Sequence, residues 1–151
     1  MIYRKATIED INELVRLRID FVREVQKVES TEGDEQLIET LTEYFGETMK
    51  EDAFISWLAI EDGRIVGTSG VCFYKLPPSF KNISGKTAYI MNMYTLPDFR
   101  GKGIANILFQ KIVEEAKNHG CEKITLNATD MGRPIYRKYG FVDSQNDMIL
   151  N

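Results

Sequence analysis

The stretch DFRGKGIANILFQ, residues 98–110, is the most informative part of this sequence. Gly101 and Gly103 flank a lysine directly in front of an apolar helical pattern that begins at Ile104. Helices usually begin with Ser, Thr, Asp or Asn, whose side chains cap the first turn. Glycines at this point leave the first backbone N–H groups bare, and the helix dipole adds positive potential there. The stretch therefore favours an anion-binding loop between a strand and a helix.

Two nucleotide-binding motifs fit the glycines poorly. A Walker A loop requires G-x-x-x-x-G-K-[ST], which this sequence lacks. A Rossmann fingerprint requires a third glycine where this chain has Asn106, and Pro97 separates the preceding strand from the loop. On the glycines alone, a flexible corner between strand and helix remains an alternative.

Hydrophobic periodicity on both sides of the loop predicts an α/β chain. We expect strands at residues 2–6, 54–60, 64–74, 87–95, 123–128 and 141–150, and helices at 11–25, 103–118 and 133–139. A further helix is indicated within residues 28–52 by an apolar stripe through Leu37, Ile38, Leu41, Tyr44 and Phe45. The order predicts a mixed central sheet with an antiparallel first half and a parallel β-α-β core around the glycines.

Three details refine this outline. Asp62-Gly63 between two apolar runs predicts a hairpin. The helix after the glycines is expected to bury Ile104, Leu108, Ile112 and Ala116. The first helix is indicated by residues that recur at helical spacing: Ile11, Leu14, Val15, Arg18, Phe21, Val22 and Val25.

Composition limits the possible classes of protein. With 151 residues, we predict a single domain covering residues 1–151. A net charge of −4 argues against a nucleic-acid binder. Cys72 and Cys121 form no disulfide pattern, and neither a leader nor a membrane span is evident, so we expect a cytoplasmic protein with no membrane partner. The only histidine, His119, stands at an expected helix end, and no metal site is predicted.

Beyond these local patterns, the loop resembles a known family. Arg100–Ala105 matches the [QR]-x-x-G-x-[GA] signature of the GCN5-related N-acetyltransferases (GNAT). Met93–Pro97 resembles the strand that enters that family's pyrophosphate loop, and Ile135–Phe141 resembles its aliphatic-Tyr-x-x-x-Gly-Phe segment. The resemblance covers about residues 87–150. It implies the GNAT acyltransferase fold, acetyl-CoA as cosubstrate and an N-acetyltransferase activity.

The resemblance also implies how acetyl-CoA is bound. The loop amides that would hold the pyrophosphate belong to Arg100, Gly101, Lys102, Gly103, Ile104, Ala105 and Asn106. The pantetheine arm would lie along Met93, Tyr94 and Thr95, where the family splays two parallel strands apart, often with a bulge. Asn127, on the second of these strands, is an expected polar contact. Arg100 and Lys102 add positive charge beside the loop or are simply solvated.

By the same resemblance, Tyr136 is the general acid that protonates the leaving coenzyme A thiolate, whereas Tyr139 and Phe141 are packing residues. Tyrosine, with a free pKa of about 10, is protonated at neutral pH, as a proton donor must be. Many family members carry a glutamate where this chain has Asn92. Glu24 and Glu29 are candidate bases by position only, a water relay is an alternative, and we assign no base.

The acceptor is less determined than the cosubstrate. The family places a lid over the acceptor site after the first strand, and here residues 28–52 hold nine acids against one base. We expect a primary amine of a small molecule, with cationic amines favoured, or of a peptide. A solvated acidic helix face would explain the same residues. The alternative function is a non-catalytic acetyl-CoA-binding regulatory module on the same fold, and a homodimer is left open.

Overall fold

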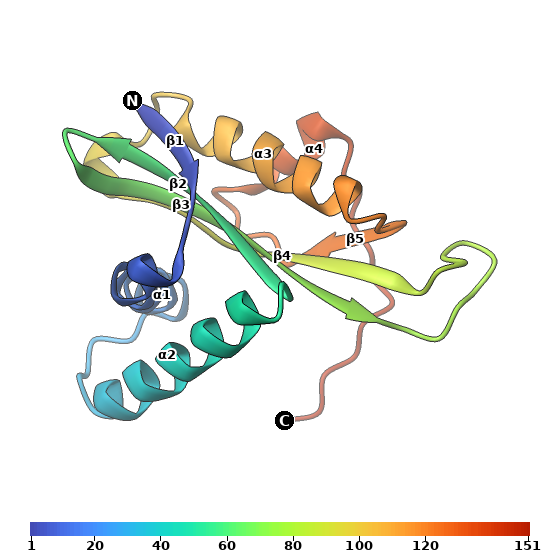
Figure 1. The fold of residues 1–151 in the computed structure, drawn as a ribbon, viewed down its shortest axis with the longest axis horizontal. Helices are drawn as coiled ribbons and strands as arrows, with labels where there is room; N and C mark the ends of the chain where they lie inside the picture. The colour runs from blue at the N-terminus through green and yellow to red at the C-terminus, as the bar shows by residue number, and fades with distance from the viewer.

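A five-stranded mixed sheet in the order β1-β2-β3-β4-β5 forms the centre of the computed structural model, which describes residues 1–151 (Figure 1). The strands are β1 (Ile2–Lys5), β2 (Phe54–Glu61), β3 (Arg64–Lys75), β4 (Lys86–Thr95) and β5 (Lys123–Leu126). Neighbouring strands from β1 to β4 pair antiparallel, and β4 pairs with β5 in parallel. The predicted antiparallel first half and parallel core are confirmed.

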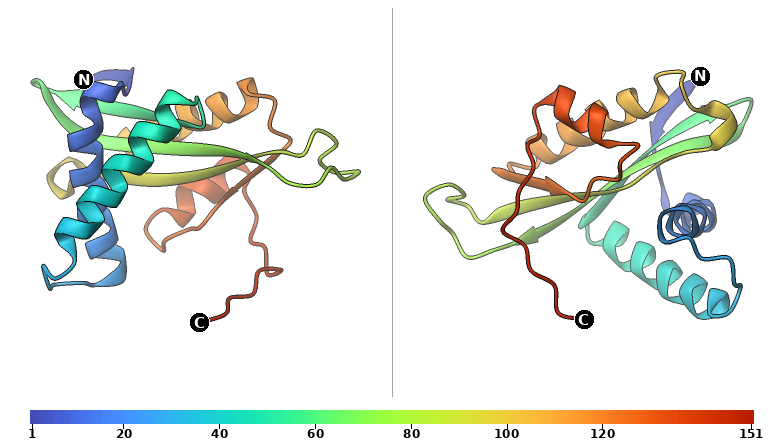
Figure 2. Two further views of the ribbon diagram at one scale, coloured as in Figure 1. Left: turned by 60° about the horizontal axis from the view of Figure 1, so that its bottom comes forward. Right: turned by 180° about the vertical axis from the view of Figure 1, so that it is seen from behind.

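Helices cover both faces of this sheet. They are α1 (Ile11–Gln26), α2 (Asp34–Lys50), α3 (Ile104–Asn118) and α4 (Arg133–Tyr139), and short 3₁₀ turns span Ile8–Asp10 and Pro97–Phe99. α1 and α2 lie on one face, whereas α3 and α4 lie on the other (Figure 2). None of these helices combines the length and apolar character that a membrane crossing requires.

The turns that shape the sheet follow local chemistry. Asp62 and Gly63 join β2 to β3 with φ values of 49° and 75°. Two successive left-handed residues match the twist of a tight hairpin, and Asp-Gly is a sequence that tolerates them. The predicted hairpin is therefore confirmed, and it aligns β2 and β3 for the pairing that continues into β4.

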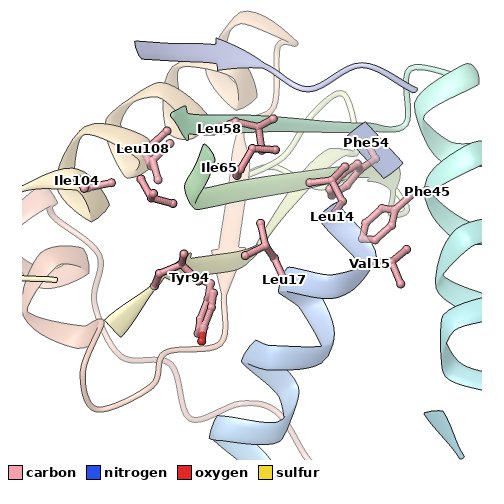
Figure 3. Close-up of a cluster of buried hydrophobic side chains, with 13 residues drawn as sticks. Leu14, Val15, Leu17, Phe45, Phe54, Leu58, Ile65, Tyr94, Ile104 and Leu108 are labelled. Atoms are coloured by element: carbon pink, nitrogen blue, oxygen red, sulfur yellow. The ribbon is translucent and has the colours of Figure 1, made fainter. Parts of the chain in front are cut away.

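Buried side chains fix the helices to the sheet. Figure 3 shows one cluster in which Leu14 and Leu17 of α1 meet Phe45 of α2 and Leu58 of β2. On the other face, α3 buries all four residues predicted from its periodicity, with exposures of 2% or less: Ile104, Leu108, Ile112 and Ala116. Burying a large aliphatic side chain contributes about 1.5–3 kcal/mol, so this packing fixes the first turn of α3 against β3.

The predicted strand at residues 141–150 is wrong. Phe141 packs near α4 and its N–H donates to the Tyr136 carbonyl, but no residue beyond it joins the sheet. Val142, Met148, Ile149 and Leu150 are exposed, and the segment leaves the body of the molecule (Figures 1 and 2). The polar run Asp143–Asp147 interrupts the alternation, so the segment has no continuous apolar face to hold it against a partner strand.

Two predictions required smaller corrections. β5 ends at Leu126 rather than at residue 128. The apolar stripe of α2 packs only in its C-terminal half, because Leu37 and Ile38 are 38% and 44% exposed whereas Phe45 is 1% exposed. The N-terminal half of α2 lies away from the sheet (Figure 1), which leaves these side chains without a sheet surface to cover.

Candidate active site

The loop between β4 and α3 bends at its two glycines. Gly101 and Gly103 have φ values of 78° and 83°, and a side chain built on either would meet no atom within 4 Å. The glycines therefore provide a left-handed backbone rather than space. The backbone N–H groups from Gly101 to Asn106 have no acceptor within the protein. Successive free amides at a helix N-terminus form a cradle for an anion.

A gap in the sheet lies next to this loop. β5 pairs with β4 only from Thr87 to Ile90, although β4 continues to Thr95. The register of β4 against β3 shifts between Thr68 and Gly70, and Asn92, opposite this shift, has φ of 56°. Asparagine tolerates this left-handed conformation better than most residues, which suits it to a bulge. The β5 side of β4 is thus left unpaired beyond Ile90.

A cleft of about 970 Å³ opens between α1, the end of β4, the glycine loop and α4. It collects ten of the twelve residues predicted to bind acetyl-CoA or to donate the proton, and it also contains the candidate base Glu24. The ten are Met93, Tyr94, Thr95, Arg100, Gly101, Gly103, Ile104, Ala105, Asn106 and Tyr136. Lys102 is not among its lining residues, and its ammonium lies 5.1 Å from the centre of the Phe99 ring. Asn127 lines a smaller neighbouring cavity instead.

Arg100 is tied to the protein rather than solvated. Its Nη1 and Nη2 atoms donate to the two Glu24 carboxylate oxygens at 2.8 Å each, and its Nε donates to the Thr95 carbonyl at 2.8 Å. These bonds fix the loop to α1 and neutralise the guanidinium charge. Hydrogen bonds from Arg100 also hold the pKa of Glu24 below its usual range, so this carboxylate is a poor proton acceptor. Glu29 lines neither cavity.

Tyr136 combines burial with access to the cleft. The residue is 7% exposed, packs on Phe109 with ring centres 4.8 Å apart, and lines both cavities. Burial raises the pKa of its hydroxyl to about 12. The hydroxyl therefore stays protonated across the physiological pH range and can act as a proton donor. Tyr139 is more exposed and packs edge-on against Phe109.

Gly132 makes room for the Tyr136 ring. A Cβ atom at Gly132 would lie 2.6 Å from Tyr136 Oη and 2.8 Å from ring carbons Cε2 and Cζ. The backbone at Gly132 is right-handed, with φ of −82°, so the glycine is needed for the close approach and not for its conformation. Sequence reasoning missed this residue. Its signal was a glycine one helical turn before the tyrosine, on the same side of α4.

The smaller cavity, of about 230 Å³, continues from the cleft toward α1. The two share six lining residues: Phe21, Val25, Met93, Ala128, Thr129 and Tyr136. Arg18, Tyr89 and Asn92 line only the smaller cavity. Asn92 is 3% exposed, and its Oδ1 accepts a hydrogen bond from Arg18 Nη1 at 3.1 Å. None of residues 28–52 lines either cavity, so the acidic segment does not form their walls.

Other side chains that drew attention in the sequence have structural surroundings. His119 ends α3 as expected and stacks on Phe73 with ring centres 4.2 Å apart. Cys72 and Cys121 are half-buried free thiols, and burial raises the pKa of each. No group of three or more His, Cys, Asp or Glu side chains is arranged to hold a metal ion.

Comparison with known proteins agrees with this geometry. Residues 17–141 match the model of the Acetyltransferase (GNAT) family. The chain belongs to this family. The matched region contains the glycine loop, the gap in the sheet and Tyr136, so the fold and the acyltransferase class predicted from the sequence are confirmed.

Three GNAT relatives illustrate the similarity. A predicted acetyltransferase from Clostridium acetobutylicum, whose crystal structure contains acetyl-CoA, superimposes with a TM-score of 0.91 at 37% identity, covering 99% of this chain and 95% of that one. Thialysine N-epsilon-acetyltransferase of Mus musculus is 23% identical over 95% of this chain and 83% of its own length. Glucosamine 6-phosphate N-acetyltransferase of Trypanosoma brucei brucei is 28% identical over 59% of this chain, and the match spans 58% of that enzyme.

Proposed function

We propose that this protein transfers an acetyl group from acetyl-CoA directly to a primary amine of a small molecule or a peptide. The observation that carries the proposal is that one cleft holds both the free amides of Gly101–Asn106 and the buried hydroxyl of Tyr136. Support comes from the Clostridium acetobutylicum relative, which was solved with acetyl-CoA, and from relatives named for acetylation of glucosamine 6-phosphate and thialysine.

The residues of the cleft fit the parts of acetyl-CoA. The amides of Gly101–Asn106 would bind the pyrophosphate, where charge-assisted hydrogen bonds are strong. The unpaired edge of β4 at Met93–Thr95 would bind the pantetheine amides in the manner of an added strand. Arg100 acts here by holding the loop against α1, since Glu24 already occupies its guanidinium. When bound, the cosubstrate supplies an activated acetyl thioester.

Tyr136 is the proton donor in the proposed reaction. The neutral amine forms a bond to the acetyl carbonyl carbon, and the carbon–sulfur bond breaks as the tetrahedral intermediate collapses. The electron pair leaves with sulfur, and Tyr136 Oη donates its proton to the departing thiolate. The nitrogen carries one extra proton after the attack, and it releases this proton through water to Tyr136, which restores the hydroxyl. Because burial raises the pKa of this hydroxyl to about 12, Tyr136 still holds its proton at neutral pH when the thiolate forms beside it.

No side chain of the cleft is assigned as the base that prepares the amine. Glu24 is held as a carboxylate by Arg100, and Asn92 has no titratable proton. We infer that the amine loses its proton to water in the open cleft. The absence of an acid at Asn92 also favours the second candidate function, a module that binds acetyl-CoA without turnover.

Two measurements separate these functions. Calorimetry with acetyl-CoA tests binding, and release of free thiol with a panel of primary amines tests transfer. We expect binding together with thiol release that depends on the amine. Binding with no release across the panel would establish the non-catalytic module, and an absence of binding would refute both functions.

A further inference from the structure

Arg18 differs from the other arginines of this chain. Six of the eight form ion pairs with carboxylates: Arg4, Arg16, Arg23, Arg100, Arg133 and Arg137. Arg64 is exposed on the hairpin after β2. Arg18 alone is partly buried and lines a cavity without a carboxylate beside its guanidinium.

The groups that face Arg18 are neutral. Its only hydrogen bond within the protein runs from Nη1 to Asn92 Oδ1, which uses one of the five guanidinium donors. The nearby titratable groups that act on its charge are the hydroxyls of Tyr44 from α2 and Tyr89 from β4. Burial accordingly lowers the pKa of Arg18, although the side chain remains charged at neutral pH. The Phe21 ring lies 5.7 Å from its Cζ atom.

A desolvated charge without a counter-ion is costly, and attraction to an entering anion offsets this cost. Arg18 stands on the inward-facing stripe of α1, where a hydrophobic residue would pack more favourably. The planar guanidinium can bind the two oxygens of a carboxylate or phosphate in parallel. This residue therefore has the properties of an anion-binding group held ready at the wall of a cavity.

The smaller cavity connects the Arg18 guanidinium with Tyr136. Arg18 and Tyr136 line the same space of about 230 Å³, which joins the cleft through shared residues that include Met93 and Ala128. An acceptor amine at the Tyr136 end would extend its remaining atoms toward Arg18. The volume lies below the roughly 300–1,000 Å³ of most ligand pockets, which favours a compact acceptor over a polypeptide segment.

We propose that the acceptor carries an anionic oxygen group, a carboxylate or a phosphate, besides its amine, and that Arg18 binds this group in the smaller cavity. The inference rests on the proposed acetyl transfer and narrows its acceptor. Asn92 has a positioning role here, because its amide oxygen holds the guanidinium without neutralising it. A glutamate at this position would instead pair with Arg18 and remove the free charge.

The test uses acceptors that differ only in the anionic group. L-Lysine is compared with 1,5-diaminopentane, and glucosamine 6-phosphate with glucosamine, by kcat/KM for thiol release. In the wild-type protein we expect the anionic member of at least one pair to be preferred by about 10- to 100-fold, as for a charge-assisted bidentate contact. A preference in the lysine pair assigns a carboxylate, and one in the glucosamine pair assigns a phosphate.

Two variants of α1 separate binding of the anion from general damage. Arg18→Met keeps the length of the side chain and should abolish the preference while leaving acetyl-CoA affinity unchanged. Arg16→Gln removes an exposed arginine two residues earlier and should keep the preference. Thermal melting confirms folding, and Arg18→Met should melt no lower than wild type because it removes an unpaired partly buried charge.

Calorimetry distinguishes a loss of anion binding at Arg18 from a failure of acetyl transfer. Wild type with coenzyme A should bind L-lysine or glucosamine 6-phosphate at least about 10-fold more tightly than Arg18→Met does. Equal affinity in the two proteins, or an Arg18→Met variant that keeps the preference in kcat/KM, overturns the role of Arg18. Failure of thiol release with every amine overturns the proposed transfer instead, and calorimetry then still decides the binding of the anion.

Discussion

The cleft and the smaller cavity offer different groups to the ligands that we propose for them. The cosubstrate end is built from backbone, namely the amides of Gly101–Asn106 and the unpaired edge of β4. The smaller cavity, which we propose for the acceptor, is lined by side chains that include Arg18 and Asn92 from two elements. Tyr136 lines both. A backbone site tolerates change in many side chains, whereas a side-chain site changes its ligand when one residue changes.

Removing the Tyr136 hydroxyl tests the junction of the two ends. Tyr136→Phe keeps the ring on Phe109 and therefore the packing. Turnover should fall by about 10²–10⁴-fold, the usual contribution of a general acid, with little change in acetyl-CoA affinity. Steady-state kinetics and calorimetry measure the two quantities. Turnover equal to that of wild type would reassign Tyr136 to a structural role.

A charge in the loop tests the backbone end. Gly103→Asp places a carboxylate beside the amides that would hold the pyrophosphate, and we expect acetyl-CoA affinity to fall by about 10- to 100-fold through like-charge repulsion. Calorimetry measures this affinity. Gly63→Asp is the matched control, since Gly63 has a similar φ of 75° and an equally open surrounding in the turn after β2.

Both glycine variants should lose similar stability from a left-handed aspartate, about 1–2 kcal/mol. Only Gly103→Asp should lose affinity. Equal affinity in the two variants would show that the loop does not carry the pyrophosphate.

Filling the space beside Tyr136 tests how tightly Gly132 and the Tyr136 ring are packed. Gly132→Ala should destabilise the protein by about 1–3 kcal/mol, because the new methyl overlaps the Tyr136 ring. Gly46→Ala is the control, since Gly46 lies within α2 with open space around it and should gain up to about 1 kcal/mol. Denaturant unfolding gives both values. If both variants changed the free energy of unfolding in the same direction, the Tyr136 ring would have shifted without cost.

The ion pair between the loop and α1 should have the smallest effect. The pKa of Glu24 is lowered in the folded state by Arg100, so the pair stabilises the protein above the unfolded pKa of about 4.3 and loses its effect as pH falls through the folded pKa. Both side chains are partly exposed, and screening limits the contribution to about 0.2–1 kcal/mol.

Glu24→Gln should therefore cost up to about 1 kcal/mol at pH 7. It should match wild type in acid, below the folded pKa of Glu24. Unfolding curves across this pH range measure the difference. A constant difference at every pH would show that Glu24 acts through packing rather than charge.

Much of the cosubstrate end could be predicted because its signals are local. The bare amides after the loop glycines, the helix periodicity and the Asp-Gly turn depend on neighbours in the chain, and the structure reproduces each. The tail after Phe141 could not be predicted from its apolar residues, because a strand also needs an edge to pair with. The pairing of Arg100 with Glu24 could not be predicted either, because the two residues are 76 positions apart in the chain.

The sequence by itself determined the order of the elements, the bare amides at the start of α3 and the family to which the chain belongs. Only the tertiary structure decided which charges remain free. It neutralised Arg100 with Glu24, left the acids of α2 away from the cavities and left Arg18 against an uncharged asparagine. The reason is physical: backbone conformation follows from local sterics, whereas the state of a charge depends on what folding brings within a few ångströms of it.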